Sequence, residues 1–136
     1  MLESSKTLPE AKIHPEVLVI RFDASFYYAN VPYLDEWLIK AVADRPNLNW
    51  IVINCRGVNS VDVIAVEGLE DLISGYRSRG IKILFAGVKR PIRDRLKRAG
   101  WDDKFGGIAD YPTTRDALRA TGLLEGSRSR VHRSSR

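Results

Sequence analysis

The chain contains 136 residues, of which 44% are hydrophobic and 29% are charged, and these values are typical of one soluble globular domain rather than two. The formal net charge is +5, but the last eleven residues hold four arginines and no acid, so 18 basic and 17 acidic residues remain elsewhere. The predicted folded part is therefore nearly neutral, which argues against nucleic acid as a partner.

Both ends of the chain are predicted to lie outside the domain. Residues 1–16 contain two prolines and show no hydrophobic periodicity, so we interpret them as a linker into a domain at 17–124. Residues 125–136 are rich in Ser and Arg and are predicted to be disordered, because they cannot bury enough apolar surface to offset the entropy of ordering. Such an end is able to contact anionic lipid, but an inert, solvated end is the favoured interpretation. No apolar run is long enough to predict a membrane span.

The first half of the domain alternates predicted strands and helices. The run "EVLVIRFDA" is rich in β-branched and apolar residues and predicts a strand over 17–23. In "NVPYLDEWLIKAVADRP", apolar residues recur at helical spacing between Pro32 and Pro46, as expected for a helix that buries one face. The nearly continuous apolar run at 50–54 predicts a strand that is covered on both faces.

The second half repeats this alternation. A helix buries a stripe from Ala65 to Tyr76, with acidic residues early and basic residues late, as the helix dipole favours. A strand at 81–86, a charged helix at 90–100, a short strand at 108–109 and a helix from Thr113 or Thr114 to Thr121 follow. This order predicts an α/β fold with a mostly parallel sheet of about four to five strands, flanked by about four helices.

Motifs for catalysis and for cofactor binding are absent from the sequence. No glycine follows the first predicted strand, so neither a dinucleotide fingerprint nor a P-loop occurs. The only histidines, His14 and His132, lie outside the predicted core elements, so no catalytic triad and no histidine metal site is expected. The single Cys55 ends an apolar run and is interpreted as a buried, reduced thiol. We therefore expect no enzyme, no cofactor and no metal.

The segment "NSVDVIAVEGL" joins a predicted strand to a predicted helix, which is where α/β proteins usually place functional groups. Asn59, Ser60, Asp62 and Val63 form the first candidate site, a loop that contacts a ligand or a protein partner. Asp62 is interpreted as a carboxylate that initiates the helix, and Ser60 as a helix N-cap. Asp23 also follows a strand and is able to approach Asp62, but a turn or capping role for each acid is favoured over acid-base catalysis.

The second candidate site is the charged helix, which holds six cations between residues 89 and 98. Lys89, Arg90, Arg93 and Lys97 are assigned to a surface that faces an anion, such as a lipid headgroup, a nucleotide phosphate or an acidic partner. A solvated helix face is the alternative interpretation, because a run of charges usually faces water and Asp94 with Arg98 forms a stabilising i, i+4 pair.

Aromatic residues gather around the first predicted strand-to-helix junction. Stacking on single-stranded nucleic acid needs interleaved basic residues, and this stretch has none. We interpret the group as core or as an interdomain contact: Phe26, Tyr27, Tyr28, Tyr33 and Trp37.

Two runs of the sequence resemble a known family. "LPEAKIHPEVLVIRFDASFYYANVPYL" contains a proline-acid pair in a linker, a strand ending in Phe-Asp-Ala and an aromatic-aromatic-Ala-Asn motif. "WIVINCRGVNSVDVIAVEGLEDLISGYRSRGIKILFAGVKRPIRDRLKRAG" adds an Arg-Gly-Ile turn, a Val-Lys-x-Pro-Ile-Arg-Asp stretch and a following Ala-Gly. In this order the motifs resemble the STAS domain at the cytoplasmic end of SulP-type anion transporters, over residues 8–124.

The resemblance implies a β-sheet with flanking helices and a regulatory, non-catalytic role. In the full transporter such a domain is attached to a membrane domain that carries anions such as sulfate or bicarbonate. The implied partners are that membrane transport domain, at the cytoplasmic face of the membrane, and cytosolic proteins.

Two alternative functions stay open. Free-standing STAS proteins, the anti-sigma factor antagonists of partner-switching cascades, place a phosphorylatable Ser or Thr directly after the Asp that Asp62 matches. Here Val63 follows and has no hydroxyl, and Ser60 is a substitute two residues earlier. Some STAS domains bind nucleotides near this loop, and the amides of residues 61–64 suit a phosphate at a helix N-terminus, whereas Asp62 repels it. Weak nucleotide or anion sensing is therefore the second alternative.

Overall fold

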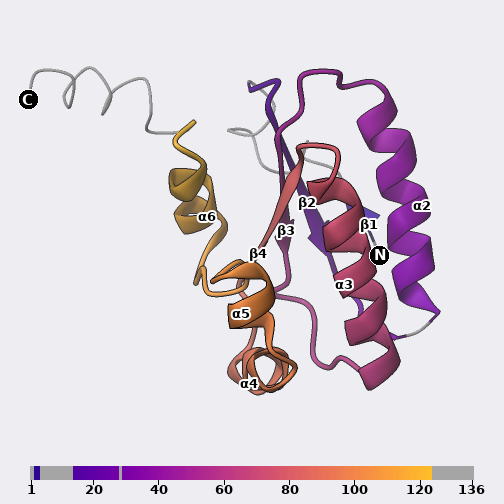
Figure 1. The fold of residues 1–136 in the computed structure, drawn as a ribbon, viewed down its shortest axis with the longest axis vertical. Coiled ribbons are helices and arrows are strands. Elements are labelled where there is room, and N and C mark those ends of the chain that lie inside the picture. The colour runs from indigo at the N-terminus through magenta and orange to yellow at the C-terminus, as the bar shows by residue number, and fades with distance from the viewer. Residues whose placement is uncertain (1, 4–13, 28, 124–136) are drawn as a thin grey trace, which may run out of the picture.

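A four-stranded sheet with the order β1-β2-β3-β4 forms the centre of the structure (Figure 1). The computed structural model describes residues 2–3, 14–27 and 29–123, so the tail predicted at 125–136 lies outside the described residues. Three of the four strands are parallel, as predicted, and have their carboxyl ends at one end of the sheet: β2 (Val17–Phe22), β3 (Trp50–Asn54) and β4 (Lys82–Ala86).

The first strand was not predicted. β1 (Leu2–Glu3) pairs antiparallel with β2, with Leu2 opposite Phe22 and Glu3 opposite Arg21. It falls within the segment interpreted as a linker, most of which lies outside the described residues. A strand of two residues leaves no alternating pattern in a sequence, so periodicity gives no signal for it.

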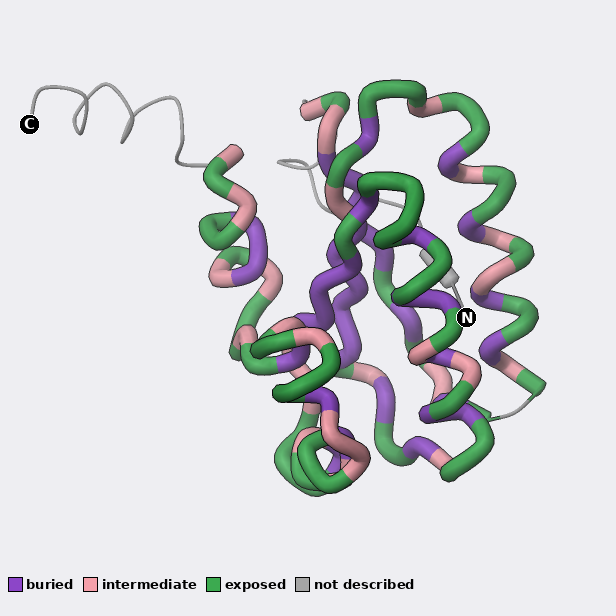
Figure 2. The backbone as a smooth tube through the Cα atoms, viewed as in Figure 1, coloured by how far each residue is buried: buried purple, intermediate pink, exposed green. Residues whose placement is uncertain are grey.

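Five helices occur among the described residues, and they cover the two faces of the sheet unequally. The larger apolar cluster joins one face of the sheet to four of them, and the smaller cluster joins the opposite face to the last helix alone (Figures 1 and 2). The helices are α2 (Asn30–Ala43), α3 (Val63–Arg77), α4 (Arg90–Arg98), α5 (Trp101–Phe105) and α6 (Thr114–Thr121).

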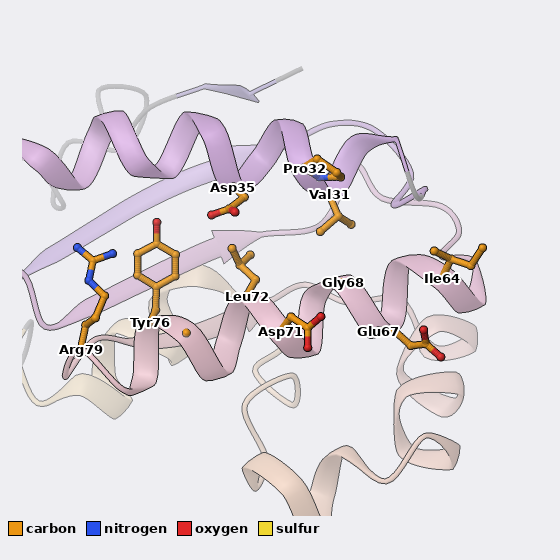
Figure 3. Close-up of a pocket in the computed structure, with 11 residues that line it drawn as sticks. Val31, Pro32, Asp35, Ile64, Glu67, Gly68, Asp71, Leu72, Tyr76 and Arg79 are labelled. Carbon is orange, nitrogen blue, oxygen red and sulfur yellow. The ribbon is translucent and has the colours of Figure 1, made fainter.

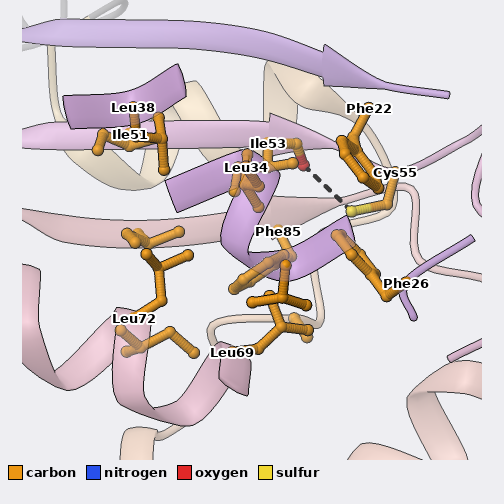
Figure 4. Close-up of a cluster of buried hydrophobic side chains, with 14 of the residues drawn as sticks. Phe22, Phe26, Leu34, Leu38, Ile51, Ile53, Cys55, Leu69, Leu72 and Phe85 are labelled. Atoms are coloured by element: carbon orange, nitrogen blue, oxygen red, sulfur yellow. Dashed lines mark hydrogen bonds between the residues drawn. The ribbon is translucent and has the colours of Figure 1, made fainter. Parts of the chain in front are cut away.

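Alternation along the strands assigns side chains to these two faces. Ile51, Ile53 and Phe85 point toward α2 and α3 and belong to the cluster drawn in Figure 4. Val52 and Leu84, at the positions between them, pack with α6. Both sets are at least 97% buried, which explains why these strands read as continuous apolar runs.

The predicted strand at 108–109 does not form. Instead, the Ile108 carbonyl accepts one hydrogen bond from Phe85 N, at 2.8 Å, and Tyr111 makes an isolated parallel bridge with Ala86. The segment thus follows the edge of β4 without a continuous ladder. Gly106, at φ +76°, turns the chain just before it, so too few residues stay extended to form a strand.

The charged helix predicted at 90–100 is shorter than expected. α4 ends at Arg98, and Gly100 has φ +88°, a left-handed conformation that stops a helix. A separate helix, α5, begins at Trp101 and was not predicted, because five residues are too few to show a helical period.

Candidate functional site

The β3–α3 loop (residues 55–62) leaves the carboxyl edge of the sheet through a tight turn. Asn54 Oδ1 accepts a hydrogen bond from Arg56 N at 3.0 Å, and Val58 N donates to the Cys55 carbonyl at 2.9 Å. A Cβ atom at position 57 would collide with the carboxylate of Asp23, so Gly57 allows the loop to pass this close to the end of β2.

The second half of the loop is tied to the segment that follows β2. Phe26 N donates to the Ser60 carbonyl at 2.9 Å, and Asp62 N donates to the Phe26 carbonyl at 3.1 Å. Phe26 is 3% exposed and stacks on Phe22 with ring centroids 4.6 Å apart. The loop therefore has a defined backbone path, anchored to the apolar core.

Asp62 is the N-cap of α3. Its backbone is extended, with φ −95° and ψ 168°, and its side chain accepts a hydrogen bond from Ala65 N at 2.7 Å. This confirms Asp62 as the carboxylate that initiates the helix. The interpretation of Ser60 as the N-cap is wrong, because Ser60 lies two residues before the cap and uses its carbonyl to accept from Phe26.

Three apolar side chains are exposed beside this cap and form what we name the cap patch: Tyr27, Val63 and Ile64. Val63 and Ile64 are each 61% exposed and Tyr27 is 49% exposed. Their positions are fixed, because Tyr27 follows Phe26 and Val63 follows Asp62, which are joined by a hydrogen bond. Sequence reasoning included Val63 in the candidate loop but missed Ile64.

The remaining aromatic residues of the junction divide between core and surface. Trp37 is partly buried and packs against the larger apolar cluster, which confirms a core role for it and for Phe26. Tyr33 is 48% exposed on the first turn of α2, and Tyr28 lies outside the described residues.

Asp23 and Asp62 are engaged by different partners. Asp23 pairs with Arg21, with Oδ1 and Nε 3.0 Å apart, whereas Asp62 caps α3. Within the described residues, no group of three or more His, Cys, Asp and Glu side chains is placed to hold a metal ion. The capping role favoured for Asp62 is confirmed, whereas the structure shows Asp23 in an ion pair.

The cations of the second candidate site do not converge on one point. Lys89, the residue before α4, donates to Asn59 Oδ1 in the β3–α3 loop and so joins the two candidate sites. Lys97 lies 3.2 Å from Asp102 and 3.9 Å from Asp110. Arg90 is exposed, and Arg93 is half-buried, with a buried Nε that has no hydrogen-bond partner in the described part of the chain.

A groove with a volume of about 610 Å³ lies between α2 and α3 and was not predicted (Figure 3). Asp35 extends from α2 toward α3, while Leu72 and Tyr76 extend from α3 toward α2. Glu67 and Asp71 line it from α3, and Ile64 of the cap patch lies at one end. The lining residues of α3 repeat about once per helical turn. This spacing predicts that they share one face of a helix, but it does not predict a groove beside that helix.

The buried thiol predicted at position 55 is confirmed. Cys55 is 1% exposed within the larger apolar cluster, where its Sγ lies 3.7 Å from the Ile53 carbonyl (Figure 4). Burial raises the pKa of the Cys55 thiol well above its ordinary value, because a thiolate is poorly solvated in apolar surroundings. A thiol in this state is a poor nucleophile.

Comparison with known proteins identifies the fold that carries these surfaces. Residues 9–125 match the family model described as the STAS domain. The chain belongs to the STAS domain family. The resemblance noted over residues 8–124 is therefore confirmed.

Two relatives of this STAS domain are named sulfate transporters. Sulfate transporter 1.2 of Arabidopsis thaliana is 30% identical over 122 residues, which cover 82% of this chain and 18% of the relative. A probable sulfate transporter of Mycobacterium tuberculosis is 31% identical over 113 residues, which cover 82% of this chain and 20% of the relative. The chain thus spans about a fifth of the length of these relatives.

Solved structures agree on the fold. The STAS domain of a SulP transporter from Vibrio cholerae is 19% identical, with a TM-score of 0.62, and the match covers 83% of this chain and 84% of that chain. The murine Solute Carrier 26 family member A9 anion transporter is 19% identical, with a TM-score of 0.68, over 84% of this chain and 19% of that chain. The predicted α/β STAS fold is confirmed.

One feature concerns phosphorylation in a partner-switching cascade, and a second concerns membrane-spanning helices. The residue directly after the Asp62 cap is Val63, which begins α3 and is exposed but has no hydroxyl to accept a phosphate. No helix among the described residues is long and apolar enough to cross a membrane.

Proposed function

We propose that this STAS domain is the non-catalytic regulatory and interaction domain of a SulP-like secondary transporter of anions such as sulfate or bicarbonate. The observation that carries the proposal is the family match together with two relatives, named sulfate transporters, that are about five times as long as this chain. In such a protein the domain lies at the cytoplasmic face of the membrane and contacts the membrane transport domain of the same polypeptide.

The cap patch is the surface that we assign to this contact. Its three side chains are apolar and between 49% and 61% exposed, and they lie on a backbone held by hydrogen bonds to the core. Exposed apolar residues on a rigid support are typical of protein interfaces, because little entropy is lost when they are covered.

The gene sequence upstream of Leu2 tests the proposal directly. We expect it to encode several apolar segments of about 20 residues each, the length that crosses a bilayer as a helix. A native reading frame that starts at Met1, with no such segments before it, contradicts the transporter role.

The contact role is tested in the full-length protein reconstituted into lipid vesicles. The double variant Val63→Ser and Ile64→Ser removes the apolar surface, so we expect sulfate uptake to fall. Ile39→Ser is the matched control, since Ile39 is 54% exposed on α2 but lies away from the cap patch. Equal uptake by the double variant and the control is incompatible with a contact at the cap patch.

We also propose weak binding of a nucleotide or another anion beside the β3–α3 loop. The supporting observation is the hydrogen bond from Lys89 to Asn59, which places a cation next to the N-terminus of α3. Titration with GTP, ATP or sulfate is expected to produce saturable amide shifts at residues 59–64 in nuclear magnetic resonance spectra. Absence of saturation at millimolar ligand argues against this second role.

A further inference from the structure

The α2–α3 groove has the length and shape needed to bind a helix. It follows α3 from Ile64 to the end of the helix and reaches Arg79 just beyond it, which gives a helical length of about 20 Å. The two helices meet at Gly68, where a Cβ atom would lie 3.1 Å from Val31 Cγ1. They separate toward Gly75, where an added Cβ would meet no other atom within 4 Å. A third helix is able to lay a ridge of side chains between them.

Acidic side chains line this groove from both helices. Asp35 projects from α2, and Glu67 and Asp71 are one turn apart on α3 (Figure 3). None of the three forms a salt bridge with a residue that the structure describes. Arg79, at the far end, is held over the Tyr76 ring at 5.1 Å. Glu67 and Asp71 therefore form, with Asp35, a negative surface that has no counter-ion among the described residues.

Apolar side chains lie below and beside these acids. Val31 and Leu72 are 5% and 6% exposed and contribute to the floor, whereas Ile64 is 61% exposed at the end of the groove. A partner that covers both kinds of surface needs apolar side chains on the face that enters the groove and cations on its flanks. These are the properties of a cationic amphipathic helix.

We propose that the α2–α3 groove docks a cationic amphipathic helix of a partner protein. Lysine or arginine side chains of that helix pair with Asp35, Glu67 and Asp71, and its apolar face covers Ile64 and Leu72. Charge complementarity orients such a partner, and the apolar contacts slow its release. The inference goes beyond the proposed transporter role and shares only Ile64 with the cap patch, so different variants test peptide binding to the groove and sulfate uptake.

The probe is a labelled amphipathic helical peptide of about 18 residues, composed of leucine and lysine. Its counterpart carries glutamate in place of lysine. We expect saturable binding of the lysine peptide to the full chain, measured by fluorescence anisotropy, and no binding of the glutamate peptide. Amide shifts are expected to follow the residues of α2 and α3 that line the groove.

Neutralising the groove tests the electrostatic part. We expect Asp35→Asn, Glu67→Gln and Asp71→Asn together to weaken binding about tenfold, since each exposed ion pair contributes modestly. The matched control removes three exposed acids outside the groove, Glu36→Gln, Asp44→Asn and Asp103→Asn. An equal loss in the control means that the peptide is drawn by overall charge, and the proposal is then overturned.

Filling the groove tests the site without harming the fold. Gly75→Leu places a side chain in the open part of the groove and replaces a helical glycine, so the variant is expected to be at least as stable as the parent in urea. We expect this variant to lose at least tenfold in peptide affinity. Unchanged affinity overturns the proposal, and so does concentration-dependent self-association that Gly75→Leu abolishes, because a second copy is then the occupant.

Discussion

The two long edges of α3 carry similar acidic residues in opposite situations. On one edge, Glu70 Oε2 accepts hydrogen bonds from Trp101 Nε1 at 3.0 Å and from Lys104 Nζ at 3.1 Å. On the other edge, Asp71 is exposed in the α2–α3 groove and has no salt bridge to a described residue. Two neighbouring acids thus differ in what surrounds them, although the sequence presents them as a pair.

The difference separates a structural surface from a surface that is free to bind. The edge with Glu70, which we name the closed edge, is covered by α5, whose Trp101 and Phe105 rings pack edge to face with centroids 5.4 Å apart. The edge with Asp71, which we name the open edge, is covered by α2 only in part, because the helices touch at Gly68 but leave space at Gly75. Binding surfaces are expected where packing inside the domain stops, and not simply where charge is high.

Trp101→Ala is expected to give the largest loss of stability, because it removes the buried ring that packs α5 against the closed edge of α3. Trp101 is 2% exposed and also contacts the Phe85 ring, with centroids 5.7 Å apart. Truncation of a buried tryptophan costs about 3–5 kcal/mol, so the free energy of unfolding measured in urea should fall by about this amount. A loss below about 1 kcal/mol would mean that α5 adds little to the core.

Glu70→Ala and Asp71→Ala compare the two edges directly. Glu70→Ala leaves the buried indole N–H of Trp101 without its acceptor, which costs about 1–3 kcal/mol. Asp71→Ala removes an exposed acid and adds a better helix former, so stability should change by less than about 0.5 kcal/mol. Urea unfolding of both variants checks the contrast, and similar values for the two would remove it.

The buried face of α3 could be predicted from the sequence, but the neighbours of its two edges could not. The apolar stripe from Ala65 to Tyr76 was read correctly, because residues that share a buried helix face repeat at a fixed spacing. Which neighbour covers each flank of that stripe depends on the angle and distance between helices, which no local pattern encodes. α5 was missed because five residues are too few to show a helical period, and the partners of Glu70 were missed with it.

In the β3–α3 loop, too, the local signals were predicted correctly and the contacts between distant residues were not. Asp62 was correctly predicted to initiate α3, since an acid before an apolar period is a local signal. Ser60 was misassigned, because Ser and Asp have similar capping propensity and only the backbone path separates them. The pairing of Lys89 with Asn59 joins residues 30 positions apart, and the sequence placed them in separate sites.

Asp62→Ala tests the end of α3 that the two edges share. Loss of the hydrogen bond to Ala65 N should lower the free energy of unfolding by about 1 kcal/mol. Asp62→Ser should recover most of this loss, because a serine hydroxyl also caps. Ser60→Ala serves as the control and is expected to change stability by less than about 0.3 kcal/mol; a larger loss for Ser60→Ala than for Asp62→Ala would contradict the assignment of the cap.

Asp35→Asn is expected to give the smallest effect, which appears only at high pH. Burial raises the pKa of Tyr76 above its ordinary value of 10.0, and the negative charge of Asp35 raises it further, while Arg79 lowers it. The folded state therefore favours the neutral phenol. Above about pH 10 the unfolded chain loses this proton first, so stability falls as the pH rises through the pKa of folded Tyr76.

In Asp35→Asn the pKa of Tyr76 should move back toward the ordinary value, and the loss of stability at high pH should become smaller. Titration of the tyrosine Cζ resonances by nuclear magnetic resonance measures the shift, and Tyr76→Phe assigns the signal. Glu36→Gln is the control, because Glu36 lies on α2 outside the groove. An unchanged pKa of Tyr76 in Asp35→Asn would mean that water already screens the charge of Asp35. The acids of the groove would then create little negative potential for a cationic partner.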